Sequence, residues 1–296
     1  MLIPPRRIVL SGGGIRAVAH LGALEALDER GLLKNIKEYI GVSAGAFVGF
    51  SLMIGYTLKE LRMLCTLFDF TLIRNLDPEA AFEFPTTYGF DDGTSLIKLF
   101  QSLLRMKKIP LTCTFAQWHA LHPEVSLRCF ATDLFTTGSR EFSLKKSPNV
   151  ELVTALRASM CLPPYFTPVI DPETGHLLVD GGIINNFPLE LLTLDEIQTC
   201  IGISFAYSKQ MQVKEIPDLM SYFGQLFASH FIPRTSDMYR KYKEICIIIP
   251  CAEYPSWNFE ATKEEREEII EKGKKAAEDF CSQFKSRIPL RRYSVS

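Results

Sequence analysis

The stretch YIGVSAGAFVGF, residues 39–50, places a serine between a short extended run and a long apolar run. Its first four residues are typical of a strand, and the residues after the serine are apolar on all sides, as expected of a buried helix. Gly41 and Gly45 flank Ser43 in the pattern G-x-S-x-G, where glycines remove side chains that collide inside a sharp turn. The stretch predicts a strand, a tight turn and a helix, with Ser43 exposed at the sheet edge as a candidate nucleophile.

A similar unit precedes this one. Residues 7–10 (RIVL) predict a strand, residues 11–14 (SGGG) a turn, and apolar residues then recur with helical spacing over 18–27. Further strands are predicted at 125–132, 176–179, 200–206 and 246–250, and further helices at 57–68, 95–105, 149–159 and 262–284. Strands that alternate with helices favour a parallel sheet. We therefore expect an α/β fold, a three-layer sandwich whose mainly parallel central sheet is covered by helices on both faces.

The composition indicates one large globular unit. A chain of 296 residues with 47% hydrophobic content can fill one large core or two smaller ones. No repeat or composition break marks a boundary, so we expect a single domain over 1–296. Its core motifs lie in 6–190, and 191–296 adds strands, a helix and a basic tail. The tail contains Lys285, Arg287, Arg291 and Arg292.

The charge and the apolar runs limit the partners and the location. A net charge of -1 provides no overall field for a polyanion, which argues against nucleic acid. The longest apolar stretch, 44–56, contains glycines and is shorter than the ~20 residues of a membrane-spanning helix. Prolines and arginines interrupt the N-terminus where a signal peptide needs an apolar run. We expect a cytoplasmic protein whose membrane contact is peripheral.

The cysteines do not suggest a metal site. All eight are set without a C-x-x-C pair and mostly lie singly inside apolar runs. This pattern is typical of reduced, buried thiols. We expect neither a disulfide framework nor a bound metal.

The three consecutive glycines after the first strand are a candidate anion site. The backbone N–H groups of Gly12, Gly13 and Gly14 can point into one small space beside a helix N-terminus. Arg16 can bring a guanidinium near a phosphate or a developing oxyanion. A nucleotide-phosphate site is an alternative, but the spacing lacks both the G-x-G-x-x-G series and the G-K-[ST] ending.

Asp180 closes a short predicted strand and is followed by Gly181 and Gly182. An aspartate at a strand end can bring its carboxylate near Ser43 when the backbone after it is unobstructed. In isolation, the same pattern is also typical of an ordinary turn.

Together these residues resemble the patatin-like phospholipase family. The similar segments are SGGGIRA at 11–17 (its oxyanion loop), GVSAG at 41–45 (its nucleophile elbow), ASMCLPPYFTP at 158–168 (its A-S-x-x-x-P-x-x-F-x-P segment) and DGGIINNFP at 180–188 (its aspartate segment). The resemblance covers roughly residues 6 to 190. One position differs, because the family usually has glycine where this chain has Ala17.

The resemblance implies a lipid acyl hydrolase of the phospholipase A or lysophospholipase type that needs no calcium, cofactor or catalytic histidine. By position, Ser43 is the nucleophile, Asp180 accepts its proton, and the amides of 12–14, with Arg16 nearby, hold the oxyanion. The implied partner is a lipid at a membrane or lipid-droplet surface.

Several alternatives stay open. Ser43, Asp180 and His230 follow the chain order of an α/β-hydrolase triad. The same site can also serve a triacylglycerol lipase or an acyltransferase, and a catalytically weak lipid-binding module can keep the fold.

Acyl chains need an apolar groove. The candidates are Phe47, Phe50, Leu52 and Met53 after the serine, and Phe82, Phe84 and Phe90 further along. The last three lie in the irregular stretch 69–94, which is expected to form a lid or a rim of the site.

Overall fold

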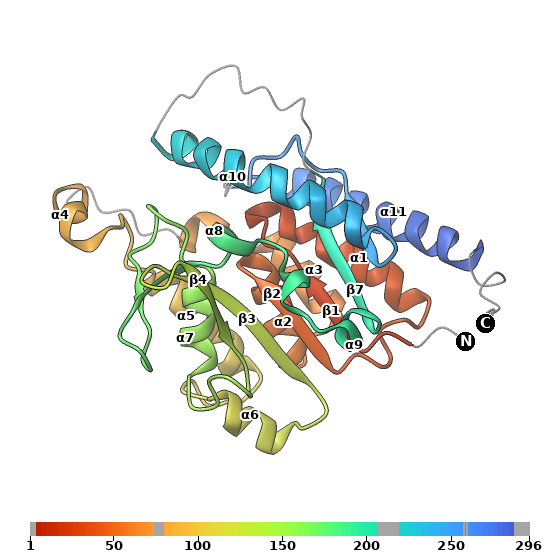
Figure 1. The fold of residues 1–296 in the computed structure, drawn as a ribbon, viewed down its shortest axis with the longest axis horizontal. Coiled ribbons are helices and arrows are strands. Elements are labelled where there is room, and N and C mark those ends of the chain that lie inside the picture. Colours follow the sequence, from red (N-terminus) through yellow and green to blue (C-terminus); the bar gives the residue numbers. More distant parts are fainter. Residues whose placement is uncertain (1–3, 74–79, 207–218, 257, 259, 287–296) are drawn as a thin grey trace, which may run out of the picture.

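The computed structural model describes residues 4–73, 80–206, 219–256, 258 and 260–286. Its central sheet has the strand order β5-β6-β3-β2-β1-β7-β8, and β4 pairs with β3. Figure 1 shows β4, β3, β2, β1 and β7 of this sheet. The strands are β1 (Arg7–Leu10), β2 (Glu38–Val42), β3 (Ser126–Asp133), β4 (Gly138–Phe142), β5 (Val169–Ile170), β6 (Leu177–Asp180), β7 (Cys200–Phe205) and β8 (Cys246–Ile249). Five strands pair in parallel, namely β1, β2, β3, β7 and β8. The remaining three join by antiparallel pairing.

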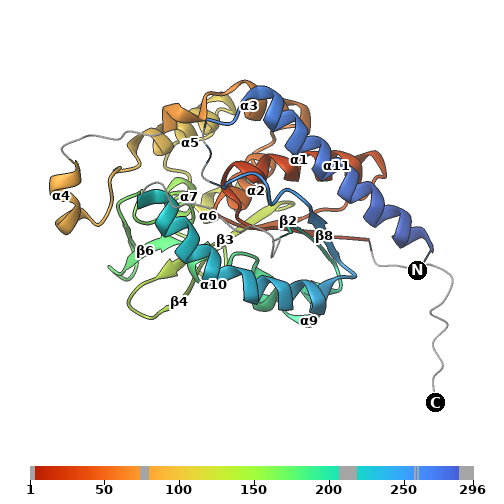
Figure 2. The same ribbon diagram turned by 90° about the horizontal axis from the view of Figure 1, so that it is seen from above.

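Helices cover both faces of this sheet. They are α1 (Val18–Glu29), α2 (Ala44–Met53), α3 (Leu58–Leu67), α4 (Ala80–Thr87), α5 (Thr94–Met106), α6 (Phe115–Leu121), α7 (Leu152–Ser159), α8 (Gly182–Asn185), α9 (Leu194–Ile197), α10 (Leu219–Tyr242) and α11 (Lys263–Ser286). The described residues also include three 3₁₀ turns, η1 (Gly14–Ala17), η2 (Phe70–Ile73) and η3 (Pro188–Leu191). Figure 2 shows α1, α2, α3 and α11 on one side of the sheet and α10 on the other. The predicted fold class is confirmed.

The two faces of the sheet have separate apolar cores. In β1, Ile8 and Leu10 belong to the larger cluster, while Val9 belongs to the smaller one. This division follows from the alternation of side chains along a strand. The larger cluster includes residues from Ile8 to Cys281, so the C-terminal region packs on the same core as the first strand.

The stretch 69–94 differs from the irregular segment that we expected. It contains η2 and α4, and α4 includes Pro85. Residues 74–79 lie outside the described part. Pro85 obscures the helical pattern in the sequence because proline is unfavourable inside a helix.

The pairing of β3 brings two distant segments of the chain together. β4 occupies one edge of β3 over Cys129–Asp133. Therefore β2 and β6 share the other edge of β3. There β2 pairs with β3 residues up to Phe130, and β6 pairs with β3 residues from Ala131 onward. The two strands meet end to end, so Asp180 at the end of β6 lies directly beyond the end of β2, where Ser43 follows.

Candidate active site

Ser43 lies in a strained turn between β2 and α2. Its backbone has φ 53° and ψ -130°, a positive φ that few residues other than glycine adopt. The flanking glycines show why the turn needs them. A Cβ at Gly41 would lie 2.5 Å from the Ala46 nitrogen, and one at Gly45 would lie 2.5 Å from the Leu10 oxygen. The geometry is that of a nucleophile elbow.

The turn is held in place from below by Ser159 at the end of α7. The Ser43 backbone N–H donates to Ser159 Oγ at 3.0 Å, and Ser159 Oγ donates to the Phe130 carbonyl at 2.7 Å. Ser159 lies in the segment 158–168, and no pattern there indicates a contact with Ser43. Ser159 therefore joins the strained turn to Phe130 of the neighbouring strand β3.

Asp180 contacts the Ser43 side chain. Its carboxylate accepts hydrogen bonds from the Ser43 side chain and, at 2.7 Å, from the Gly182 N–H. The side chain is buried, and burial raises the pKa of the carboxyl group from 3.8 to about 6, against the lowering effect of these hydrogen bonds. A carboxylate with such a pKa is a better base near neutral pH than an exposed aspartate.

The two glycines after Asp180 allow this close packing. A Cβ at Gly181 would lie 2.2 Å from the Phe130 oxygen and 3.2 Å from Val42 Cγ1. A Cβ at Gly182 would lie 2.9 Å from Asp180 Oδ1. Both positions therefore need glycine for steric reasons.

The glycine loop lies beside the serine. A Cβ at Gly12 would lie 3.1 Å from Ser43 Cβ, so the loop approaches closely. The amides of Gly13 and Gly14 have no hydrogen-bond acceptor within the described ranges. The Gly12 amide is different, because it donates to the Asn186 carbonyl at 3.1 Å. This contact corrects the expectation that all three amides are open to an anion.

Arg16 was expected near the oxyanion, but its side chain points to a different part of the protein. Its side chain is buried, and its guanidinium donates to the carbonyls of Tyr254 at 2.5 Å and Ala252 at 3.4 Å. The Ile15 N–H donates to the Ser256 carbonyl at 2.9 Å. Arg16 thus fastens the glycine loop to the C-terminal segment 252–256, a contact that the sequence analysis did not identify.

His20 supports the loop from the protein interior. Its Nε2 lies 2.9 Å from the Ser11 carbonyl, which can only accept, so Nε2 carries the proton. Burial lowers the pKa of the imidazole to about 4, against the smaller raising effect of that hydrogen bond. The ring also packs on Phe205 at a centroid distance of 4.7 Å. His20 is a neutral structural donor.

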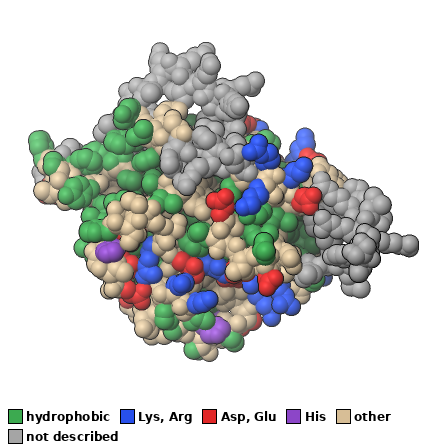
Figure 3. Space-filling model, viewed as in Figure 1, with side chains coloured by type: hydrophobic (Ala, Val, Ile, Leu, Met, Phe, Trp, Pro, Cys, Tyr) green, Lys and Arg blue, Asp and Glu red, His purple; other side chains and the backbone are tan. Residues whose placement is uncertain are grey.

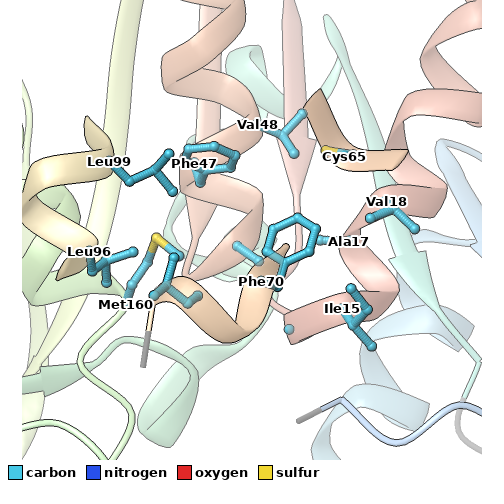
Figure 4. Close-up of a pocket in the computed structure, with 13 residues that line it drawn as sticks. Ile15, Ala17, Val18, Phe47, Val48, Cys65, Phe70, Leu96, Leu99 and Met160 are labelled. Carbon is cyan, nitrogen blue, oxygen red and sulfur yellow. The ribbon is translucent and has the colours of Figure 1, made fainter. Parts of the chain in front are cut away.

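A pocket that is partly open to solvent begins next to this site. Gly14 and Ala44 line it near the glycine loop and the start of α2. The rest of the lining is apolar and consists of Ile15, Ala17, Val18, Phe47, Val48, Cys65, Phe70, Ile73, Leu96, Leu99 and Met160. Figure 4 shows these side chains facing one space from η1 and α1 on one side and α5 on the other.

The aromatic candidates divide into three groups. Phe47 lines the pocket, whereas Phe50 is fully buried in the core. Phe84 and Phe90 stack on each other at 4.6 Å, and Phe82 is 86% exposed. Of the other two candidates, Met53 is buried in the core and Leu52 packs against it.

Other kinds of site are not evident. Within the described residues, no group of three or more His, Cys, Asp or Glu side chains could hold a metal ion. In the same part of the chain, no helix is long and apolar enough to cross a membrane. His230 lies in α10, but its side chain is outside the described part.

Comparison with known proteins gives consistent matches. The family model described as patatin-like phospholipase matches residues 8–193. The uncharacterized protein YqhO of Bacillus subtilis is 28% identical over 93% of this chain and 98% of its own length. A probable lipid hydrolase, 463L, of invertebrate iridescent virus 6 is 29% identical over 63% of this chain and 62% of its own. The crystal structure of VipD from Legionella pneumophila shares the fold, with a TM-score of 0.61 at 17% identity, over 95% of this chain and 67% of VipD.

Proposed function

The chain belongs to the patatin-like phospholipase family, and from this premise we propose that it cleaves carboxylic esters of membrane lipids at Ser43. The proposed type is a calcium-independent phospholipase A or lysophospholipase. One observation carries the proposal. The Ser43 side chain is hydrogen-bonded to a buried carboxylate beside two amides that have no acceptor among the described residues, where an apolar pocket begins.

In the proposed acylation step, Ser43 Oγ attacks the ester carbonyl carbon while Asp180 takes the hydroxyl proton. The carbonyl oxygen becomes an oxyanion, which the N–H groups of Gly13 and Gly14 stabilise. The tetrahedral intermediate then collapses. The bond to the leaving alkoxide breaks, and Asp180 returns the proton to that oxygen.

Deacylation repeats the same steps with water as the nucleophile. Asp180 accepts a proton from the water molecule, and the resulting hydroxide attacks the acyl-Ser43 carbonyl. Collapse of the second intermediate releases the fatty acid and restores the serine. The proposed dyad is thus sufficient for both half-reactions, with the buried carboxylate acting first as base and then as acid in each.

The pocket supports an acyl chain as the group beside the ester carbonyl. Its walls come from Ile15, Phe47, Val48 and Phe70, among others, and burial of apolar chain against such walls is favourable by about 0.8 kcal/mol per methylene. We propose that the acyl chain of the substrate lies here and that the head group faces solvent.

We also propose peripheral contact with a lipid surface. Phe135, 66% exposed, follows the carboxyl end of β3, and Ile170, 65% exposed, ends β5. Together with Phe82 on α4, they place apolar side chains at the end of the sheet that carries Ser43. Figure 3 shows apolar side chains gathered in the region where α4 lies. Arg287, Arg291 and Arg292 of the basic tail lie outside the described residues.

The direct test uses the wild type and Ser43→Ala. Wild type is expected to hydrolyse p-nitrophenyl acyl esters and to react with a fluorophosphonate, whereas Ser43→Ala does neither. Mass spectrometry of products from a mixed lipid extract then separates the alternatives. Released fatty acid with lysophospholipid supports a phospholipase, diacylglycerol supports a lipase, and a new ester supports an acyltransferase. Absence of any reaction by wild type favours a lipid-binding module.

His230→Ala separates the dyad from a triad. The proposed dyad retains turnover in this variant. Loss of turnover in a folded His230→Ala protein is the result that contradicts the dyad.

A further inference from the structure

Asn186, the residue after α8, forms hydrogen bonds with both the N–H and the carbonyl of Gly12. The Asn186 carbonyl accepts the Gly12 N–H at 3.1 Å, and Asn186 Nδ2 donates to the Gly12 carbonyl at 3.0 Å. The two residues are 174 positions apart in the chain. The segment that follows α8 is therefore clamped onto the glycine loop.

This clamp fixes the orientation of two consecutive peptide groups. In the peptide between Ser11 and Gly12, His20 binds the carbonyl and Asn186 binds the N–H. In the next peptide, Asn186 Nδ2 binds the Gly12 carbonyl, and the N–H of that same peptide belongs to Gly13. In a trans peptide, the C=O and the N–H point in opposite directions. The Gly13 N–H is therefore directed away from Asn186.

A fixed orientation matters here because glycine backbones rotate easily. Without a partner for the Gly12 carbonyl, the peptide between Gly12 and Gly13 has more orientations available at little steric cost. An oxyanion donor is effective only when it is already aimed at the developing charge. The side chain of Asn186 provides this aim through the hydrogen bond from Nδ2 to the Gly12 carbonyl.

Asn186 also lies close to the catalytic carboxylate. The Cβ that would be present at Gly182 is 2.7 Å from Asn186 Oδ1 and 2.9 Å from Asp180 Oδ1. The short α8 thus connects the proposed base to the proposed oxyanion donor, so the two parts of the site are positioned by one segment.

We propose that Asn186 is a positioning residue for the oxyanion loop, which aims the Gly13 N–H at the ester oxygen by holding the Gly12 carbonyl. This role rests on the proposed function of Ser43. The clamp itself can be tested separately from that function, because the orientation of the loop is measurable without turnover.

The kinetic test compares Asn186→Asp with Asn185→Asp. The first substitution keeps the side-chain shape but replaces the donor to the Gly12 carbonyl with an acceptor. The second adds the same charge one residue away and keeps the acceptor for the Phe187 N–H, a bond of 3.2 Å in the wild type. With a p-nitrophenyl ester, at a pH above the acid limb of each protein, we expect Asn186→Asp to lower kcat by on the order of 10²-fold with little change in KM.

Asn186→Ala removes the donor without adding charge and is expected to lower kcat by a similar factor. Asn185→Asp should stay close to wild type. If Asn186→Asp and Asn186→Ala both keep wild-type kcat, or if Asn185→Asp loses as much, the positioning role is wrong.

A second measurement does not depend on catalysis. In spectra of protein labelled with ¹⁵N-glycine, the amide resonances of 12–14 are expected to shift in both Asn186 variants and to stay in place in Asn185→Asp. Unchanged resonances overturn the clamp even if wild type is active. Wild type without Ser43-dependent turnover overturns the proposed function, while the spectra still decide the clamp.

Discussion

Asp180 carries a carboxyl group whose ionised form the proposed mechanism requires, although its surroundings disfavour that form. Burial raises its pKa from 3.8 to about 6, and the hydrogen bonds from Ser43 and Gly182 offset only part of this effect. In the proposed mechanism only the carboxylate can accept the Ser43 proton. We therefore expect kcat/KM to fall as the pH drops below an apparent pKa near 6. At about pH 5 we expect roughly one tenth of the plateau, whereas an unshifted aspartate leaves the rate almost intact.

The same shift predicts that Asp180→Asn is more stable than wild type. A carboxyl group with a higher pKa in the fold than in the unfolded chain binds its proton more tightly in the fold. The wild type therefore loses stability as the pH rises from the unfolded pKa, near 4, to the folded pKa, near 6, and no further. The shift corresponds to about 3 kcal/mol. Asparagine does not ionise and keeps an oxygen for the Gly182 N–H, so it avoids this cost.

The assay combines denaturant unfolding with ester hydrolysis over a range of pH. Asp180→Asn should be inactive and more stable than wild type above the folded pKa, with the difference disappearing toward about pH 4. Asp171→Asn is the matched control. Burial favours a raised pKa for Asp171, but hydrogen bonds and charge from Arg140 lower it, so this substitution should destabilise. An acid limb near the unshifted value, or an Asp180→Asn protein less stable than wild type above the folded pKa, refutes the reasoning.

Three further changes test other parts of the site. Gly14→Ala places a Cβ 1.9 Å from the Ser256 oxygen at a residue with φ +55°, so ester turnover should be lost; wild-type rates contradict this packing. Ser159→Ala removes the acceptor of the Ser43 N–H and should lower unfolding free energy by about 1–3 kcal/mol together with kcat, as measured by denaturation and kinetics. Val48→Phe narrows the pocket, so turnover of long-chain relative to acetyl esters should fall; an unchanged ratio removes the pocket from acyl binding.

The sequence predicts those parts of the structure that depend on residues close together in the chain. The turn at Ser43 is one example, because its two glycines stand within two residues of the serine and each avoids a contact of 2.5 Å. The strands β1 and β2 are also local signals, since each is an apolar run that ends at a turn. Fold class follows from the alternation of such strands with helices.

The features that the sequence does not reveal depend on contacts between distant residues. The bond from Ser43 to Ser159 joins positions 116 apart, and Arg16 reaches carbonyls more than 230 residues away. A serine or an arginine gives no sign in the sequence of which backbone group it binds. The charge of Arg16 suggests a role near an anion, whereas its guanidinium is bound to two carbonyls.

The sequence does not predict helix α10 (Leu219–Tyr242), and the reason is different. It includes Gly224 and Pro233, two residues that weaken a helix and interrupt its apolar period. Met238, at its C-terminal end, packs in the smaller core cluster together with Phe187. Burial against the sheet therefore compensates for weak local propensity, a contribution that a local reading of the sequence does not include.

The proposed site residues are held in place partly by a segment that lies outside the matched family region. The family model ends at residue 193, and all of the predicted site residues lie before that point. The glycine loop, however, is held by Ser256 through the Ile15 N–H and by Tyr254 through Arg16. Gly14 also packs directly against the Ser256 carbonyl. Because an oxyanion donor must be fixed before the reaction begins, we expect the proposed chemistry to require the segment 252–256 as well as the glycines that it holds.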